Sequence, residues 1–222
     1  MPKDLAIVLN NGSINSAVIT ALAAQKFRPV LLHGESTPPG SPNLSRARSA
    51  YDQQVAHFKP YREHTMSMPF LSTFEQPASK TAASVVDPRQ GVSITPAMVS
   101  LLPFVTAAVR YAIHYKAGAI YIGLRVGGST DELSQATEFV QIWTEMVNHP
   151  LGQPELEIQT PLLELEPWQV VDVGVNVGAP FDRTWTCLEE GAEPCGGCRG
   201  CRMRDQAFQQ AAKPDPAKPV KR

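Results

Sequence analysis

The four cysteines constrain this chain more than any other feature, because all of them lie in one short stretch near the C-terminus. They are Cys187, Cys195, Cys198 and Cys201, in the pattern Cys-x7-Cys-x2-Cys-x2-Cys. Four thiolates complete a tetrahedral Zn²⁺ site, and the x2 spacings allow neighbouring sulfurs to reach one metal from a tight turn. The interspersed glycines permit such turns. The pattern therefore predicts a structural zinc site that fastens the C-terminal end to the body of the protein.

Disulfide bonds are the main alternative use of these cysteines. Disulfides belong to oxidising compartments, yet the first residues, Met-Pro-Lys-Asp-Leu-Ala, lack the long apolar region of a signal peptide. No stretch approaches the ~18 apolar residues of a membrane span. We therefore expect a cytoplasmic chain with reduced thiols and no membrane association. Thiol redox chemistry and an iron–sulfur cluster stay open as further alternatives.

Length and charge narrow the function classes. The 222 residues, 43% of them hydrophobic, suffice for one substantial α/β domain with a small appendage. Twenty basic and 21 acidic residues give a net charge of -1, which argues against nucleic acid or an anionic membrane as a partner. Three arginines near the cysteines are the local exception, and we interpret them as a solvated rim: Arg199, Arg202 and Arg204.

Apolar runs alternate with helical patterns along the chain, which predicts a doubly wound parallel sheet. The run 5–9 (Leu-Ala-Ile-Val-Leu) is typical of a strand that is buried on both faces, and a polar loop over 10–16 follows it. Further strands are expected at 29–32, 61–66, 119–124 and 158–163. Helices are expected at 17–27, 44–58, 95–116, 131–147, 168–177 and 203–211. In such sheets, ligands bind outside the carboxyl ends of the strands.

The cysteine region carries a family resemblance. Residues 184–208, from Thr-Trp-Thr-Cys to Ala-Phe, resemble the zinc region of the 7-cyano-7-deazaguanine synthases, which belong to the PP-loop superfamily. The similarity continues through 160–163 (Thr-Pro-Leu-Leu) and 177–180 (Val-Gly-Ala-Pro), and the order of elements matches along nearly the whole chain. The resemblance implies conversion of a carboxylated deazaguanine and ammonia into a nitrile at the expense of ATP, in queuosine biosynthesis. It also implies a homodimer.

The expected organisation has three parts. A Rossmann-like PP-loop domain spans 1–182, a zinc-binding subdomain with a closing helix spans 183–210, and a disordered tail spans 211–222. The tail has three prolines and four basic residues without apolar periodicity. Inside the first domain, the polar stretch 69–92 contains Pro77 and Pro88 and is expected to be a lid or a disordered segment.

The nucleotide loop departs from the family pattern. The family reads Ser-Gly-Gly-x-Asp-Ser, and the matching residues here are Asn11, Gly12, Ser13, Ile14, Asn15 and Ser16. Ser13 places a Cβ where close approach of a phosphate is expected, and Asn15 has no negative charge for a cation. We therefore expect a degenerate ATP site and doubt that ATP and Mg²⁺ are used.

Two further family motifs are altered, and no catalytic residue is assigned. The signature Pro-Ala-Arg-Asn has become Pro-Ala-Met-Val at 96–99, and the substrate loop has become Arg-Val-Gly-Gly-Ser-Thr-Asp at 125–131. Arg125 and Asp131 remain candidates for the substrate cleft. His33 is a third candidate because it lies near a strand's carboxyl end, where it would act with Glu35 in acid–base chemistry. The alternative is a loop histidine with a structural hydrogen bond.

Two functional hypotheses follow. The first is a repurposed or non-catalytic relative that binds a purine-like small molecule or a protein partner, with weak affinity for ATP. The second is an active, diverged ATP-dependent ligase that makes 7-cyano-7-deazaguanine or modifies a related carboxylate. A zinc-ribbon module for nucleic acid is a weaker third, because it requires clustered basic and aromatic residues.

Overall fold

The structure, a computed structural model, describes residues 4–36, 42–73, 95–126, 130–149, 156–189 and 191–217. Its centre is a five-stranded sheet with the order β3-β2-β1-β4-β5, in which every neighbouring pair is parallel. The strands are β1 (Leu5–Leu9), β2 (Arg28–Glu35), β3 (Arg62–Ser67), β4 (Ala119–Tyr121) and β5 (Glu157–Gln159). The α helices are α1 (Ile14–Ala24), α2 (Pro42–Phe58), α3 (Thr95–Tyr115), α4 (Thr130–Asn148), α5 (Pro167–Asn176) and α6 (Arg199–Gln210). The doubly wound parallel sheet is confirmed.

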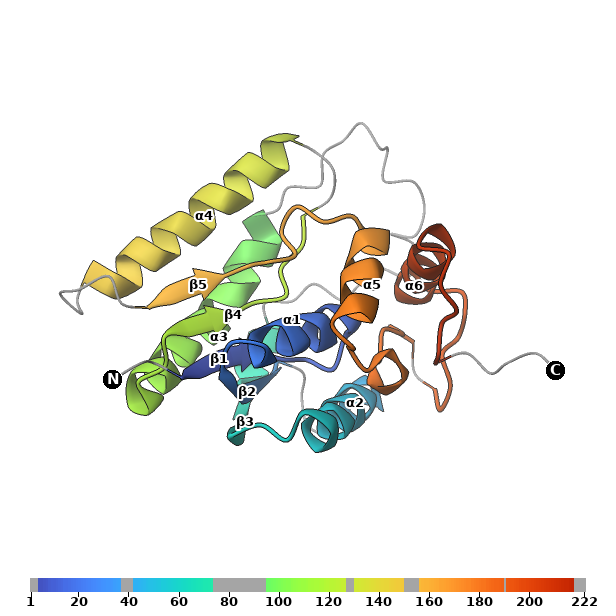
Figure 1. Cartoon of the computed structure of the whole chain (residues 1–222), viewed down its shortest axis with the longest axis horizontal. Coiled ribbons are helices and arrows are strands. Elements are labelled where there is room, and N and C mark those ends of the chain that lie inside the picture. Colours follow the sequence, from blue (N-terminus) through green and yellow to red (C-terminus); the bar gives the residue numbers. More distant parts are fainter. Residues whose placement is uncertain are drawn as a thin grey trace.

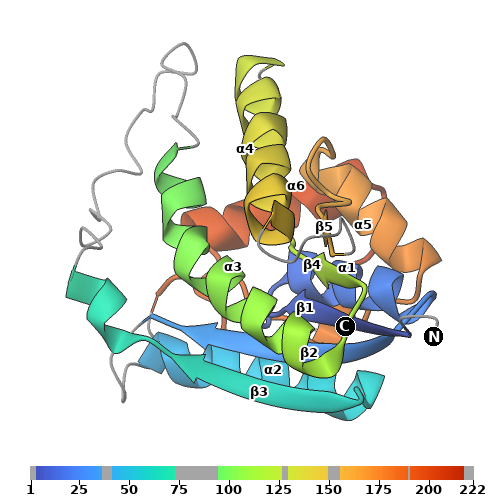
Figure 2. The same cartoon turned by 90° about the vertical axis from the view of Figure 1, so that its left-hand side faces the viewer.

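Helices cover both faces of the sheet. On one face, α3 and α4 bury Met98, Val105 and Trp143 against strand residues such as Ile7 and Ile120. The residues of β1 alternate, so Ala6 and Val8 face the other side. There they pack with α1, α2, α5 and α6 (Figures 1 and 2). Two separate apolar cores result, and the continuous apolar run of β1 lies between them.

Several element boundaries differ from the sequence predictions for local reasons. Helix α1 begins at Ile14, three residues before the expected start, because the Ser13 side chain caps it and accepts from the Ser16 amide. Helix α6 begins at Arg199, where Cys198 takes the N-cap position and its sulfur accepts from the Cys201 amide. Strand β4 is shorter than expected and ends at Tyr121. The short extended segment expected at 158–163 is a strand only as far as Gln159.

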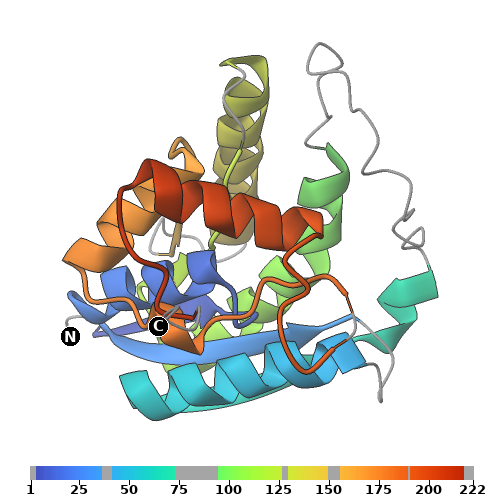
Figure 3. The same cartoon turned by 90° about the vertical axis from the view of Figure 1, so that its right-hand side faces the viewer.

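The C-terminal segment packs on the domain. Phe208 of α6 is 3% exposed and lies edge-on to Phe181, with ring centroids 5.3 Å apart. After α6 the chain turns back (Figure 3), and Asp215 pairs with the buried Arg204. The expectation of a disordered tail from residue 211 therefore needs correction for residues 211–217, which the sequence pattern did not connect to Arg204. Residues 218–222 lie outside the described part of the chain.

The expected long loop is described only at its start. Residues Pro69–Thr73 form a single 3₁₀ turn, and residues 74–92, with both prolines of the predicted lid, lie outside the described residues. Among the helices that the structure describes, none is long and apolar enough to cross a membrane.

Candidate functional site

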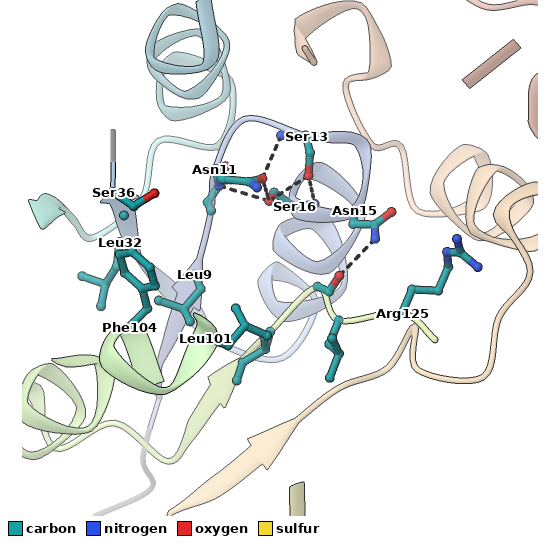
Figure 4. A pocket seen from close by; sticks show the side chains of 15 residues that line it. Leu9, Asn11, Ser13, Asn15, Ser16, Leu32, Ser36, Leu101, Phe104 and Arg125 are labelled. Carbon is teal, nitrogen blue, oxygen red and sulfur yellow. Dashed lines mark hydrogen bonds between the residues drawn. The ribbon is translucent and has the colours of Figure 1, made fainter. Parts of the chain in front are cut away.

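A cavity of about 450 Å³ opens at the carboxyl ends of β1, β2 and β4 (Figure 4). This is where a doubly wound sheet places its ligands, and the volume falls within the range of small-molecule sites. The loop after β1 and the start of α1 line one side, and α3 lines the opposite side. The lining residues are Leu9, Asn10, Asn11, Ser13, Asn15, Ser16, Leu32, Gly34, Ser36, Leu101, Phe104, Ile122, Gly123, Leu124 and Arg125.

One end of the cavity is apolar. Leu32 of β2 and Leu101 and Phe104 of α3 meet there (Figure 4). The Phe104 ring lies directly against the backbone of Gly34, where an added Cβ would come within 2.5 Å of the ring. A glycine at this position therefore lets the aromatic ring lie close to the sheet and gives the cavity a flat apolar wall.

The loop after β1 pairs its own amides with its own side chains. The Gly12 amide donates to Asn10 Oδ1 at 2.8 Å, and the Ser13 amide donates to Asn11 Oδ1 at 3.2 Å. The Asn11 amide donates to Ser16 Oγ at 3.1 Å, and the Ser16 hydroxyl donates to Asn11 Oδ1 at 2.7 Å (Figure 4). Backbone amides of this kind are the groups that cradle phosphates in Gly-rich loops. In this structure the amides of Asn11, Gly12 and Ser13 are already satisfied.

Asn15 joins the loop to the neighbouring strand. Its side-chain amide Nδ2 donates to the Gly123 carbonyl, just after β4, at 3.0 Å (Figure 4). An ionised aspartate has no proton to donate, so it would lose this hydrogen bond and face the carbonyl oxygen with its own oxygens. The amide side chain of Asn15 thus makes a structural hydrogen bond that an aspartate could not make.

Arg125 lies at the opposite end of the cavity from Leu32 and Phe104, beyond Asn15 (Figure 4). The guanidinium is half-buried and makes no hydrogen bond or ion pair with any residue in the described ranges. Burial lowers the pKa of Arg125 below its usual value; Glu166 opposes this change and Arg199 adds to it. The cavity thus has a partly desolvated cation at one end.

His33 lies outside the cavity. Its neighbours Leu32 and Gly34 line the cavity, whereas the His33 ring lies on the other face of β2 and stacks on Tyr51 with centroids 4.7 Å apart. Its Nδ1 bonds the Asn10 carbonyl oxygen at 2.9 Å, and Glu35 lies 3.7 Å from Nε2. Burial lowers the pKa of His33 below its usual value. These contacts match the structural alternative, in which His33 supports the loop.

Asp131 does not line the cavity either. It is exposed in the first turn of α4, where its charge favours the helix N-terminus. Of the three candidates for the substrate cleft, only Arg125 lines the cavity together with the residues of the loop after β1.

Sequence reasoning missed Asn10 and the wall formed by α3. Asn10 is 1% exposed, and its Nδ2 donates to Thr20 Oγ1 and to Gln54 Oε1. The available signal was an asparagine directly after a buried strand, at the edge where ligands bind. Phe104 and Leu101 read as core residues of a central helix, and nothing in their spacing distinguishes a cavity wall from a core.

The cysteine cluster has the geometry of a metal site. The four sulfurs all lie within 4.8 Å of one another, and Cys198 Sγ is 3.9 Å from Cys187 Sγ. A tetrahedron with Zn–S bonds of about 2.3 Å requires sulfurs about 3.8 Å apart. Backbone amides point at the sulfurs, including Cys195 N to Cys187 Sγ and Cys198 N to Cys195 Sγ. The set fits a divalent metal such as Zn²⁺ with no open ligand position.

Hydrogen bonds favour the thiolate form of Cys198, whereas burial raises the pKa of the neighbouring Cys201 thiol to about 12. Burial alone would raise the pKa of the Cys198 thiol, but the amides of Leu188 and Cys201 outweigh it and lower the pKa to about 6. Because metal binds thiolates, the affinity of this cluster for metal should fall as the pH decreases.

Comparison with known proteins identifies the family. Residues 5–212 match the family described as "Queuosine biosynthesis protein QueC". The chain belongs to this family. It is 25% identical to the 7-cyano-7-deazaguanine synthase of Acidobacterium capsulatum, with 96% of each chain covered. The corresponding protein of Nitratiruptor sp. is 29% identical, with 95% of this chain and 96% of that protein covered. Among solved structures, the NMN synthetase of Francisella tularensis aligns with 96% of this chain and 79% of its own, at 14% identity and a TM-score of 0.47.

Family membership confirms the resemblance that was based on the cysteine region and on the order of elements along the chain. In this QueC-family chain the loop of residues 10–16 lies between β1 and α1, and the amides of Asn11, Gly12 and Ser13 bond to side chains of the same loop.

Glycine at position 12 provides a test of the loop packing. Gly12 has φ +79°, and an added Cβ would lie 2.5 Å from the Ala47 carbonyl oxygen of α2. We expect Gly12→Ala to lower the free energy of unfolding by about 3 kcal/mol, combining backbone strain with overlap. Gly178→Ala is the matched control: its φ is +69° but nothing lies within 4 Å of the new Cβ. It should cost only about 1 kcal/mol. Urea denaturation measures both, and equal losses would contradict the packing against α2.

Proposed function

We propose that this chain is a QueC-family protein that binds a purine-like small molecule in its cavity and no longer positions the triphosphate of ATP. The pairing of the loop amides with Asn10, Asn11 and Ser16 is the observation that carries the proposal.

Phosphate binding at such a loop depends on free amides. A bound phosphate is normally held by several N–H groups and the positive end of the following helix. Here a phosphate would first have to displace the side-chain oxygens, and each displaced oxygen would need a new partner. That exchange lowers the binding free energy that the loop can offer to a phosphate.

The site also lacks a carboxylate that could help to bind the Mg²⁺ of a nucleotide. A nucleotide triphosphate binds Mg²⁺ with help from a carboxylate, and the family aspartate is Asn15 here. The amide of Asn15 is engaged with Gly123, so neither charge nor a free ligand position is offered to a cation.

The apolar end of the cavity supports a heterocyclic ligand. Leu32, Leu101 and Phe104 form a wall suited to the face of a purine ring, and Ser36 adds a polar group beside them. The cavity therefore offers a surface for a base, while the amides of the loop after β1 are already hydrogen-bonded to side chains.

Calorimetric titration of the zinc-loaded full chain with ATP, with and without Mg²⁺, tests the proposal. We expect the native chain to bind ATP more weakly than about 1 mM, with no gain from Mg²⁺. Asn15→Asp restores the family carboxylate and should make any ATP binding Mg²⁺-dependent. Asn11→Asp is the control, since it adds the same charge to the loop while keeping an oxygen that accepts from Ser13.

Tight, Mg²⁺-dependent binding of ATP by the native chain would sink the proposal. It would direct attention to the second hypothesis, an active ATP-dependent ligase, and to a search for carboxylates that the protein adenylates.

A further inference from the structure

We propose that the ligand of this cavity is a nucleoside monophosphate, with its base on the Phe104 wall and its single phosphate on Arg125. The inference deepens the proposed function and rests on it.

The two ends of the cavity differ in chemistry. Leu32 and Phe104 lie at one end and Arg125 at the other, with the loop between them (Figure 4). The ligand that matches both ends has a flat apolar ring and a separate anionic group. A nucleobase and a phosphate, joined by a sugar, have this arrangement.

The middle of the cavity is polar but uncharged. Asn11, Ser13 and Asn15 line it, and they carry amide and hydroxyl groups. Asn15 donates from Nδ2 to Gly123, while its Oδ1 accepts no hydrogen bond from the described part of the chain. A ribose hydroxyl is a suitable donor to this oxygen.

The positive charge available corresponds to one phosphate. Arg125 is the single charged side chain among the described residues that line the cavity. A guanidinium binds a phosphate through two parallel N–H groups, and a half-buried guanidinium without a protein partner gains most from such a ligand. A triphosphate would bring several further negative charges to loop amides that are already paired.

Two charged residues near Arg125, Glu166 and Arg199, leave its guanidinium able to bind a phosphate. Glu166 lies close enough to favour its charged form, and Arg199 lies close enough to disfavour it. Glu166 is engaged at the start of α5, where its backbone amide donates to Gln169 Oε1 at 2.8 Å and its side chain completes a capping box. Arg125 therefore stays available to an anion at this end of the cavity.

Titration of the zinc-loaded full chain with AMP, GMP, adenosine, guanosine, ATP and inorganic phosphate tests the inference. We expect at least one monophosphate to bind about 10-fold or more tightly than its nucleoside, than ATP and than inorganic phosphate alone. Arg125→Gln should remove this advantage and leave nucleoside affinity unchanged, and Arg125→Lys should restore part of it.

Arg199→Gln is the matched control. It removes a cation from the same neighbourhood but not from the cavity lining, so monophosphate affinity should change by no more than about 2-fold. Unchanged thermal midpoints of the variants show that folding is retained.

The outcomes separate the two proposals. Equal affinity for nucleoside and monophosphate, or an unaffected Arg125→Gln variant, overturns the mononucleotide inference and leaves the purine-like ligand. Inorganic phosphate binding as tightly as a monophosphate overturns it too, because the base would then contribute nothing. ATP with Mg²⁺ binding more tightly than any monophosphate overturns the proposed function itself. Binding of none of these compounds overturns both.

Discussion

Cys201→Ser is expected to abolish metal binding and to lower the thermal midpoint by about 10 °C. Cys201 is 4% exposed and lies in the first turn of α6, whose Phe208 is part of the core. A metal on the four sulfurs ties this helix to the segment around Cys187. Without one ligand, three thiolates and a hydroxyl hold Zn²⁺ poorly, and the linkage between segment and helix is lost.

The test measures the metal content and, by calorimetry, the thermal midpoint of the native chain and of Cys201→Ser in the same samples. The native protein should carry one equivalent of Zn²⁺, and a chelator should lower its midpoint to that of Cys201→Ser. The variant itself should not respond to the chelator, because the two treatments remove the same interaction. A variant that keeps its metal and its midpoint would show that the cluster does not hold the C-terminal segment.

The features predicted from sequence are those with local causes. The cysteine cluster could be found because its spacing alone limits where the sulfurs lie, and the resemblance placed it in its family. Strand β1 could be found because a strand buried on both faces must be apolar throughout. The loop at residues 11–16 was located for the same reason, as the polar segment that follows this strand.

The state of that loop could not be predicted, because it depends on orientation. Asn10 and Asn11 are polar in any sequence reading, but only the structure shows that their side-chain oxygens turn back to Gly12 and Ser13. His33 illustrates the same limit. It follows Leu32 by one residue and therefore points to the opposite face of β2, yet both residues lie near the strand's carboxyl end.

The C-terminal segment was misjudged because its anchor is a pair of distant residues. Proline and lysine dominate residues 211–222, and Asp215 is the one acidic residue among them. Arg204 was interpreted as part of a solvated rim with two other arginines, whereas it is buried. Nothing in the local composition of either segment indicates that these two side chains meet.

Asp215→Ala is expected to lower the free energy of unfolding by about 4 kcal/mol, because it leaves the buried charge of Arg204 without its counter-ion. Arg204 Nε and Nη2 each donate to Asp215 at 2.7 Å, and the two side chains are only 8% and 4% exposed. Truncation after residue 214 should have the same effect, since it removes the same carboxylate.

Further hydrogen bonds hold the Arg204 guanidinium in its buried position when Asp215 is removed. Arg204 also donates to Thr184 Oγ1 at 2.7 Å and to the Phe181 carbonyl at 2.9 Å, so the guanidinium cannot turn to solvent without breaking these bonds. The pair thereby connects α6 and the segment after it to the turn that precedes the cysteines.

A matched control and a double variant complete the test by urea denaturation. Asp182→Ala removes an exposed ion pair, with Arg183 at 3.6 Å, and should cost less than about 1 kcal/mol. Arg204→Met combined with Asp215→Ala should be less destabilised than Asp215→Ala alone, because no unpaired charge remains buried. If Asp215→Ala lowered the free energy of unfolding by no more than Asp182→Ala, water would stabilise the charge of Arg204 as well as the Asp215 carboxylate does. The segment after α6 would then add little to the fold, and the family core would end at the helix itself.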